Sequence, residues 1–399
     1  MKPRYGLTVG ACSVAYVVQS IVNNFLPLLF VHFTFAYKIP LYLISTIIVY
    51  NFVLQILIDF LASSLILKIG HRASCILSGI CVVTGLLFLA IVTPLLSGYI
   101  FIYINIMVAV SFMAMGSGLI EVLLSPILEA LPFDNKSAKM SFLHSFYPLG
   151  HLLVILISTL YFTIFGIEHW TYLALVILTI PLLQIFLFAI CPIVVPKGDE
   201  NKVKKFSLFK NKRFILIFIL MVAAGASEMS IAQWASYFAE SGLKVSKTVG
   251  DLVGASAFAL FMFLSRILHG FSGKRFNVAN LIVICAGALV VCYLLTVLQP
   301  SEVLSLVFIA LCGFFVGIAW PGVYSIGGKL FASGGTVMFS MMALGGDIGC
   351  SLGPMIVGFV ASGSSMDLGI MLATIFPLVL FIGMLTLKKT AKAELIEVK

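Results

Sequence analysis

Long apolar runs follow one another along the chain, separated by short stretches that contain charged residues, proline and glycine. A helix needs about 20 predominantly apolar residues to cross the hydrocarbon core of a bilayer. Twelve runs reach this length, and each is predicted to form one membrane-spanning helix. The predicted spans are residues 5–33, 40–67, 73–94, 98–130, 138–165, 169–192, 213–239, 248–273, 277–298, 302–330, 335–362 and 367–387. The pattern therefore predicts an all-α integral membrane protein with twelve transmembrane helices.

The main polar interruption is a lysine-rich segment in the middle of the chain, at residues 196–212. It divides the spans into six plus six, so we expect two six-helix bundles at residues 1–195 and 213–399, joined by a basic linker. A weak internal similarity supports a repeat: at an offset of 199 residues, Gly118 aligns with Gly317 and Gly150 with Gly349.

The distribution of basic residues predicts the orientation. If the N-terminus is cytoplasmic, every Lys and Arg except Lys38, Lys244 and Lys247 lies on the cytoplasmic side. Cytoplasmic loops of membrane proteins are enriched in Lys and Arg. Both termini and the linker are therefore expected on the cytoplasmic side of a multi-pass protein of the cytoplasmic (inner) membrane.

Composition excludes several classes of protein. Of the 399 residues, 61% are hydrophobic and 10% are charged, whereas soluble domains carry about 25% charged residues. The formal net charge of +9 does not indicate a nucleic-acid partner, because the basic residues sit at helix ends and form no contiguous stripe. The eight cysteines fall in apolar runs without a CxxC pair, so neither a metal site nor a cofactor is expected.

Charged and titratable residues inside the spans are candidates for function, because a charge at the bilayer centre costs about 2.5–3.5 kcal/mol. Five such residues stand out, one each in spans 2, 4, 5, 7 and 11: Asp59, Glu121, His144, Glu228 and Asp347.

Glu121 is the strongest candidate for proton coupling and substrate contact. It lies eleven residues before Pro132, about 16 Å from the inner helix end at 1.5 Å per residue, and thus near the midplane. A carboxyl group in apolar surroundings can take up and release a proton near neutral pH. The alternative is a structural hydrogen bond between helices.

His144, near the start of span 5, is predicted at a depth that could reach Glu121. Its imidazole suits a proton relay or contact with sugar hydroxyls, although a histidine satisfied by packing remains equally open.

Span 7 carries a polar stripe beside Trp234, and amide and hydroxyl groups next to an aromatic face are suited to binding a sugar. The residues that share this arc, at about 100° per residue, are Gln233, Ser236, Tyr237 and Glu240. Glu228 lies about 80° off the arc, so it either takes part in proton coupling or pairs between helices.

The remaining candidates are polar or aromatic residues at other depths. At the depth of a central cavity, the predicted substrate contacts are Asn23, Asn24, Trp320, Tyr324 and Asp347. Asp347 lies among glycines that permit close helix approach, so a structural bond is as plausible. Toward the cytoplasm, the predicted gate residues are Asp59, Lys68, Arg72 and Arg266.

At these residues the chain resembles a branch of the major facilitator superfamily, the bacterial L-fucose/proton symporters and related sugar transporters. The Gly-Leu-Ile-Glu segment ending at Glu121 resembles the span-4 motif that carries their protonatable glutamate, and the segment from Glu228 to Trp234 resembles their span 7. His144 and Tyr147 stand where that group has amide side chains, which implies that both contact the substrate.

The chain also departs from that group. Asn23 stands in place of the acid that the fucose symporters carry in span 1, which implies that coupling rests on Glu121. In the loop after span 2, Lys68 and Gly70 of the superfamily signature are present, but Leu67 replaces its acid.

The resemblance implies a monomeric secondary transporter that moves a small polar solute, a sugar above all, by alternating access with protons as the coupling ion. An enzyme or an ATP-driven pump is not expected, because the sequence has no HExxH motif and Gly270–Lys274 lacks the spacing of a phosphate-binding loop. Export of drugs or other amphipathic compounds by proton antiport remains the alternative, since some of the 34 phenylalanines could line a hydrophobic pocket.

Overall fold

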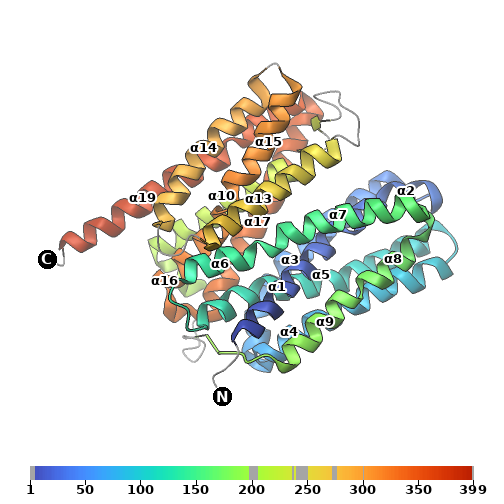
Figure 1. Ribbon diagram of the computed structural model, residues 1–399, viewed down its shortest axis with the longest axis horizontal. Coiled ribbons are helices and arrows are strands. Elements are labelled where there is room, and N and C mark those ends of the chain that lie inside the picture. The colour runs from blue at the N-terminus through green and yellow to red at the C-terminus, as the bar shows by residue number, and fades with distance from the viewer. Residues whose placement is uncertain are drawn as a thin grey trace. The chain divides into compact units, whose positions relative to one another are not determined.

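A computed structural model describes residues 5–196, 205–235, 238–239, 250–271, 276–299 and 301–397. Within these ranges the backbone is almost entirely helical and contains no strand (Figure 1). The α-helices are α1 (Tyr5–Asn24), α2 (Phe30–Ala36), α3 (Leu41–Ile69), α4 (His71–Leu87), α5 (Tyr99–Ala130), α6 (Lys136–His144), α7 (Phe146–Phe165), α8 (Trp170–Ile177), α9 (Thr179–Ile190), α10 (Lys212–Ala232), α13 (Ser256–Phe271), α14 (Val278–Leu298), α15 (Glu302–Val316), α16 (Ala319–Leu330), α17 (Gly335–Gly363), α18 (Met366–Ala373) and α19 (Ile375–Glu397).

Twelve segments of the described chain are long and apolar enough to cross a membrane, which confirms the predicted number. Their bounds are Tyr5–Leu29, Val49–Ile69, His71–Leu95, Tyr99–Ala130, Lys136–Phe165, Ile167–Ile190, Lys212–Ala232, Leu252–Phe271, Val278–Leu298, Glu302–Leu330, Ala332–Ala361 and Met366–Lys389. The protein is thus a multi-pass membrane protein.

Several spans are broken at or near a proline. The first predicted span is not one helix, because a 3-10 turn at Leu26–Leu29 containing Pro27 separates α1 from α2. Span 5 is divided between α6 and α7 at Ser145, and span 10 between α15 and α16. Proline lacks the N–H that would donate to the carbonyl four residues earlier, and Pro148 and Pro321 lie just after these last two breaks.

The chain forms two compact units, Met1–Leu131 with Phe146–Pro196, and Pro132–Ser145 with Lys197–Lys399. The second unit therefore includes α6, a segment that the sequence assigns to the first bundle. The chain leaves the first unit at Leu131, forms α6 within the second unit, and returns at Phe146. The reason is packing: α6 lies against α13 and α16.

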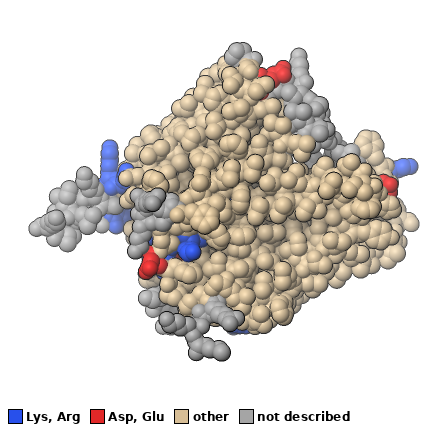
Figure 2. Space-filling view, viewed as in Figure 1, with Lys and Arg blue, Asp and Glu red and all other residues tan. Residues whose placement is uncertain are grey.

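The surface of the spans is apolar in the way a lipid-facing surface requires. Along α3, Val49, Val53, Leu57 and Leu61 repeat every four residues with 62%, 56%, 48% and 48% of their surface exposed. On the face shown in Figure 2, uncharged residues cover almost all of the surface, and Lys, Arg, Asp and Glu occur in a few small spots. A contiguous apolar surface of this extent is unfavourable in water and favourable against lipid hydrocarbon.

Close packing in the second unit depends on glycines of α17. A methyl group added at Gly349 would lie 2.0 Å from the carbonyl oxygen of Val222 in α10, and one at Gly346 would lie 2.1 Å from the ring of Trp320. The glycine-rich segment around Asp347 therefore lets α10 and α16 approach α17, as small residues do at helix contacts in membranes.

Candidate functional site

Glu121 lies in the interior of the first unit, on the middle part of α5. Its carboxylate oxygen Oε2 accepts a hydrogen bond of 2.6 Å from the side-chain amide of Gln19 on α1. Both side chains are 5% exposed, so the bond is buried. Glu121, the strongest candidate predicted from the sequence, thus accepts a hydrogen bond from a neutral amide of a neighbouring helix.

A second set of hydrogen bonds surrounds Asn23, one turn after Gln19 on α1. The Asn23 side-chain oxygen accepts from Gln55 of α3 at 3.0 Å and from Asn51 at 3.4 Å. Its amide nitrogen donates to the hydroxyl of Tyr147 on α7 at 3.4 Å. Gln55 in turn accepts from Ser117 of α5 at 3.1 Å. Four helices of the first unit therefore meet in one network of neutral polar groups.

Gln19, Gln55 and Ser117 are not among the residues predicted from the sequence, because uncharged polar side chains are common in membrane helices and stand out less than charged ones. A signal was present, since Gln19 and Asn23 are four residues apart and so share one face of α1. Gln55 and Asp59 have the same spacing on α3.

Asn24 does not join this network through any bond in the described structure. Its amide nitrogen donates to the carbonyl oxygen of Ser20, one turn earlier in the same helix, at 2.8 Å. Asn24 ends α1, and this bond serves its own helix.

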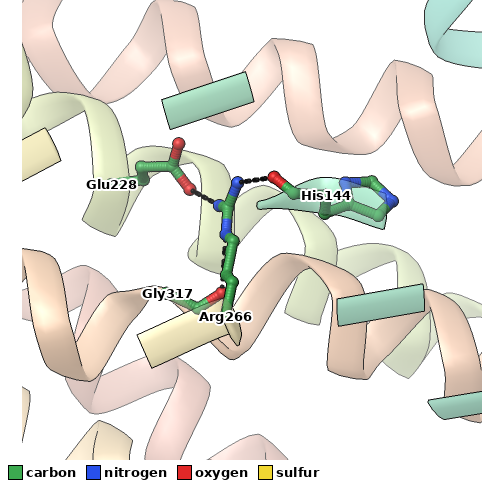
Figure 3. A network of polar contacts seen from close by, with 4 residues as sticks. All are labelled: His144, Glu228, Arg266 and Gly317. Atoms are coloured by element: carbon green, nitrogen blue, oxygen red, sulfur yellow. Dashed lines mark hydrogen bonds and ion pairs between the residues drawn. The ribbon is translucent and has the colours of Figure 1, made fainter. Parts of the chain in front are cut away.

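In the second unit, Glu228 of α10 forms a buried ion pair with Arg266 of α13, with 2.8 Å between the carboxylate oxygen and the guanidinium nitrogen Nη2. Arg266 donates two further bonds, from Nη1 to the carbonyl oxygen of His144 at 2.8 Å and from Nε to that of Gly317 at 2.9 Å (Figure 3). Glu228 thus pairs between helices, and Arg266, predicted at a gate, is the partner of this carboxylate.

The imidazole of His144 points away from the guanidinium (Figure 3) and packs on the ring of Tyr324, with 5.6 Å between centroids. Tyr324 also stacks on Phe339 at 5.6 Å and lies 6.1 Å from Trp320. Tyr324 is completely buried. Three predicted substrate residues, His144, Trp320 and Tyr324, are therefore brought together as an aromatic cluster in the second unit.

The polar stripe predicted on span 7 is only partly described. Gln233 is exposed, while the indole N–H of Trp234 donates to the carbonyl oxygen of Pro354 in α17 at 3.0 Å. Tyr237, like Ser236 and Glu240, lies outside the described residues. Asp347 is 8% exposed within the glycine-rich part of α17.

The other predicted gate residues have different surroundings. The Arg72 guanidinium donates to the carbonyl oxygens of Phe188, Ala189 and Cys191 at 2.7–2.8 Å, and so caps the C-terminal end of α9 within the first unit. Lys68 is exposed in the last turn of α3, where a cation complements the helix dipole. Asp59 is completely buried on α3.

The arrangement of twelve spans and two polar interiors can be compared with known proteins. The family model of the Major Facilitator Superfamily matches residues 8–354. The chain belongs to the major facilitator superfamily. A major facilitator protein is a transporter, and the match covers most of both units.

Solved major facilitator structures have the same fold. The fucose:proton symporter of E. coli is 15% identical, with a TM-score of 0.79 over 96% of this chain and 99% of that one. A proton:xylose symporter gives 10% identity and a TM-score of 0.83 over 95% of each chain. A human organic anion transporter gives 15% identity and a TM-score of 0.74 over 96% of this chain and 100% of that one. No curated protein sequence matches this major facilitator chain at a significant level.

Proposed function

We propose that this major facilitator transporter imports a sugar across the cytoplasmic membrane by alternating access, and that proton uptake by Glu121 drives the accumulation. The observation that carries the proposal is the pair of hydrogen-bond sets in the first unit, one joining Gln19 to Glu121 and the other joining Asn23 to Gln55. Both lie between helices that expose apolar side chains on other faces.

The network has the chemistry that hydroxyl groups require. Amide side chains offer a donor and an acceptor, and the hydroxyls of Tyr147 and Ser117 can act as either. A sugar presents several hydroxyl groups of the same dual character, so it can replace bonds within the network by bonds to itself. Two of the similar solved structures are symporters named for a sugar and a proton.

The bond from Gln19 lets Glu121 change its protonation state in place. The Gln19 N–H donates to a carboxylate oxygen when Glu121 is ionised, and can donate to the carbonyl oxygen when it is protonated. A protonated Glu121 is neutral. Closing a neutral site off from water inside the membrane costs less free energy than closing off a charged one. Release of the proton on the cytoplasmic side then favours release of the sugar, because the affinity for the sugar and the affinity for the proton are linked.

An organic anion suits these residues less well. An anion requires a cationic partner, and Arg266 is the one Lys or Arg that is buried among the described residues. Its nitrogens Nη2, Nη1 and Nε donate to Glu228, His144 and Gly317. All three nitrogens of the guanidinium therefore already donate to acceptors of the protein, which leaves this cation poorly placed to bind an organic anion.

The test is uptake of labelled monosaccharides and amino sugars into proteoliposomes, with and without an inward proton gradient. We expect one sugar to accumulate under the gradient and a protonophore to abolish the accumulation. Glu121→Gln should retain exchange of that sugar at equal pH but lose gradient-driven accumulation, because its side chain cannot release a proton.

Glu129→Gln is the matched control, since Glu129 is a half-buried carboxyl two turns further along α5; it should accumulate the sugar normally. Undiminished accumulation by Glu121→Gln would exclude Glu121 as the coupling residue. A panel without any transported sugar, together with efflux of a cationic dye under the opposite gradient, would favour the export of amphipathic compounds instead.

A further inference from the structure

Two carbonyl groups of the second unit lie four residues before a proline. His144 precedes Pro148, and Gly317 precedes Pro321. In an α-helix, each carbonyl oxygen accepts from the N–H four residues later, and proline has no N–H. Both carbonyls have therefore lost the amide donor that a regular helix would supply.

One guanidinium supplies a donor to both carbonyls. Arg266 Nη1 donates to the oxygen of His144 at 2.8 Å, and Nε donates to that of Gly317 at 2.9 Å. The third nitrogen, Nη2, bonds Glu228 at 2.8 Å, which balances the charge (Figure 3). Because a guanidinium is planar and donates in several directions, it can serve three acceptors at once.

The same residue lies at the contact between α6 and α13. Ser141 of α6 donates to the carbonyl oxygen of Arg266 at 3.0 Å, and the hydroxyl of Ser137 lies 3.2 Å from Nε2 of His269. A methyl group added at Gly270 would lie 3.0 Å from the Cβ of Phe142, so the two helices are in close contact. The bond from Arg266 to His144 fixes the last residue of α6, just before the chain returns to the first unit.

We propose that Arg266 is a positioning residue whose guanidinium replaces the two amide donors that Pro148 and Pro321 cannot supply. It thereby holds α6 in the second unit and fixes the break between α15 and α16. The positioning role itself requires no particular solute.

The test is hydrogen–deuterium exchange of the full-length protein in nanodiscs, followed by peptide. In Arg266→Gln, amides of α6 should exchange at least tenfold faster than in the wild type. Amides of α14 and α19 in the same unit should change less than twofold. A merely structural role would instead accelerate exchange throughout the second unit.

Rescue by proline replacement makes the test specific. Pro148→Ala supplies an N–H for the carbonyl of His144, so in the Arg266→Gln background it should slow exchange of α6 toward the wild-type rate. Pro321→Ala should restore the start of α16 without restoring α6. Arg266→Lys keeps the charge next to Glu228 but lacks the planar fork, so it should remain fast in α6 until Pro148→Ala is added.

Absence of rescue by Pro148→Ala, or wild-type exchange in both Arg266→Gln and Arg266→Lys, would overturn the proposal. If Arg266→Gln does not fold, the comparison is made in the Arg266→Lys background alone, with the same expected outcomes. The measurement uses no sugar and no proton gradient. A silent sugar panel therefore contradicts the proposed function only, and a failed rescue contradicts the positioning role only.

Discussion

Asn23 and Asn24 are neighbours in the sequence, but the structure gives them different partners. Asn23 bonds to side chains of α3 and α7, whereas Asn24 bonds to the backbone of its own helix. At the residue scale, what matters is the direction of a side chain, because adjacent positions on a helix point about 100° apart.

Replacing each asparagine by alanine tests this difference. In Asn23→Ala, we expect the KM for the accumulated sugar to rise about tenfold, which corresponds to about 1.4 kcal/mol. Asn24→Ala should leave the KM within about twofold of the wild type, by the same relation between energy and affinity. The measurement is initial uptake into proteoliposomes over a range of sugar concentrations. A KM for Asn23→Ala within about twofold of the wild type would show that the side chains around Asn23 do not contact the sugar.

Glu228 should contribute mainly to stability through its pair with Arg266. Glu228→Gln leaves a buried guanidinium without its counter-charge, and breaking a buried pair in this way costs about 3–5 kcal/mol. We expect a lower apparent melting temperature of the detergent-solubilised protein. Glu302→Gln, at the exposed start of α15, is the control and should melt close to the wild type. A Glu228→Gln protein as stable as the control would show that the pair adds no net stability.

At the scale of elements, small residues and prolines determine how the helices meet and where they break. The glycines of α17 let α10 pass at backbone contact, and Gly349 is the closest of these approaches, 2.0 Å from the carbonyl oxygen of Val222 for an added methyl group. Prolines explain the breaks after α6 and α15 in the same physical terms, through the loss of one amide donor.

Gly349→Ala should therefore destabilise the second unit. The added methyl group forces α10 and α17 apart, and overpacking of this kind costs about 1–3 kcal/mol. Gly10→Ala on α1 is a matched control, because nothing lies within 4 Å of a methyl group added there. Thermal unfolding in detergent should show a lower transition temperature for Gly349→Ala alone. Identical transition temperatures for the two variants would mean that α10 and α17 can move apart without a loss of stability.

At the scale of the whole molecule, the distribution of basic residues predicts the orientation in the membrane. Lys38 is predicted on the outer side of the membrane and Lys210, in the linker, on the cytoplasmic side. Both residues are exposed in the structure. Seven of the eight native cysteines are buried and Cys350 is partly so, which keeps their labelling low.

Single cysteines at these two lysines test the orientation. A membrane-impermeant maleimide added to intact cells should label Lys38→Cys, and should label Lys210→Cys only after the cells are permeabilised. The unsubstituted protein measures the background. The reverse pattern would invert the topology and place both termini outside.

The sequence by itself determined the membrane class and the number of spans, because these depend on the length and polarity of continuous segments. The breaks within spans 5 and 10 were not predicted, although Pro148 and Pro321 lie just after them in the chain. Only the tertiary structure decided which side chains meet. Gln19 reaches Glu121 and Arg266 joins Glu228 across 102 and 38 positions of sequence, and helical periodicity carries no information about which helices are neighbours. The assignment of α6 to the second unit was likewise decided by its packing against α13 and α16, which no pattern within residues 132–145 specifies.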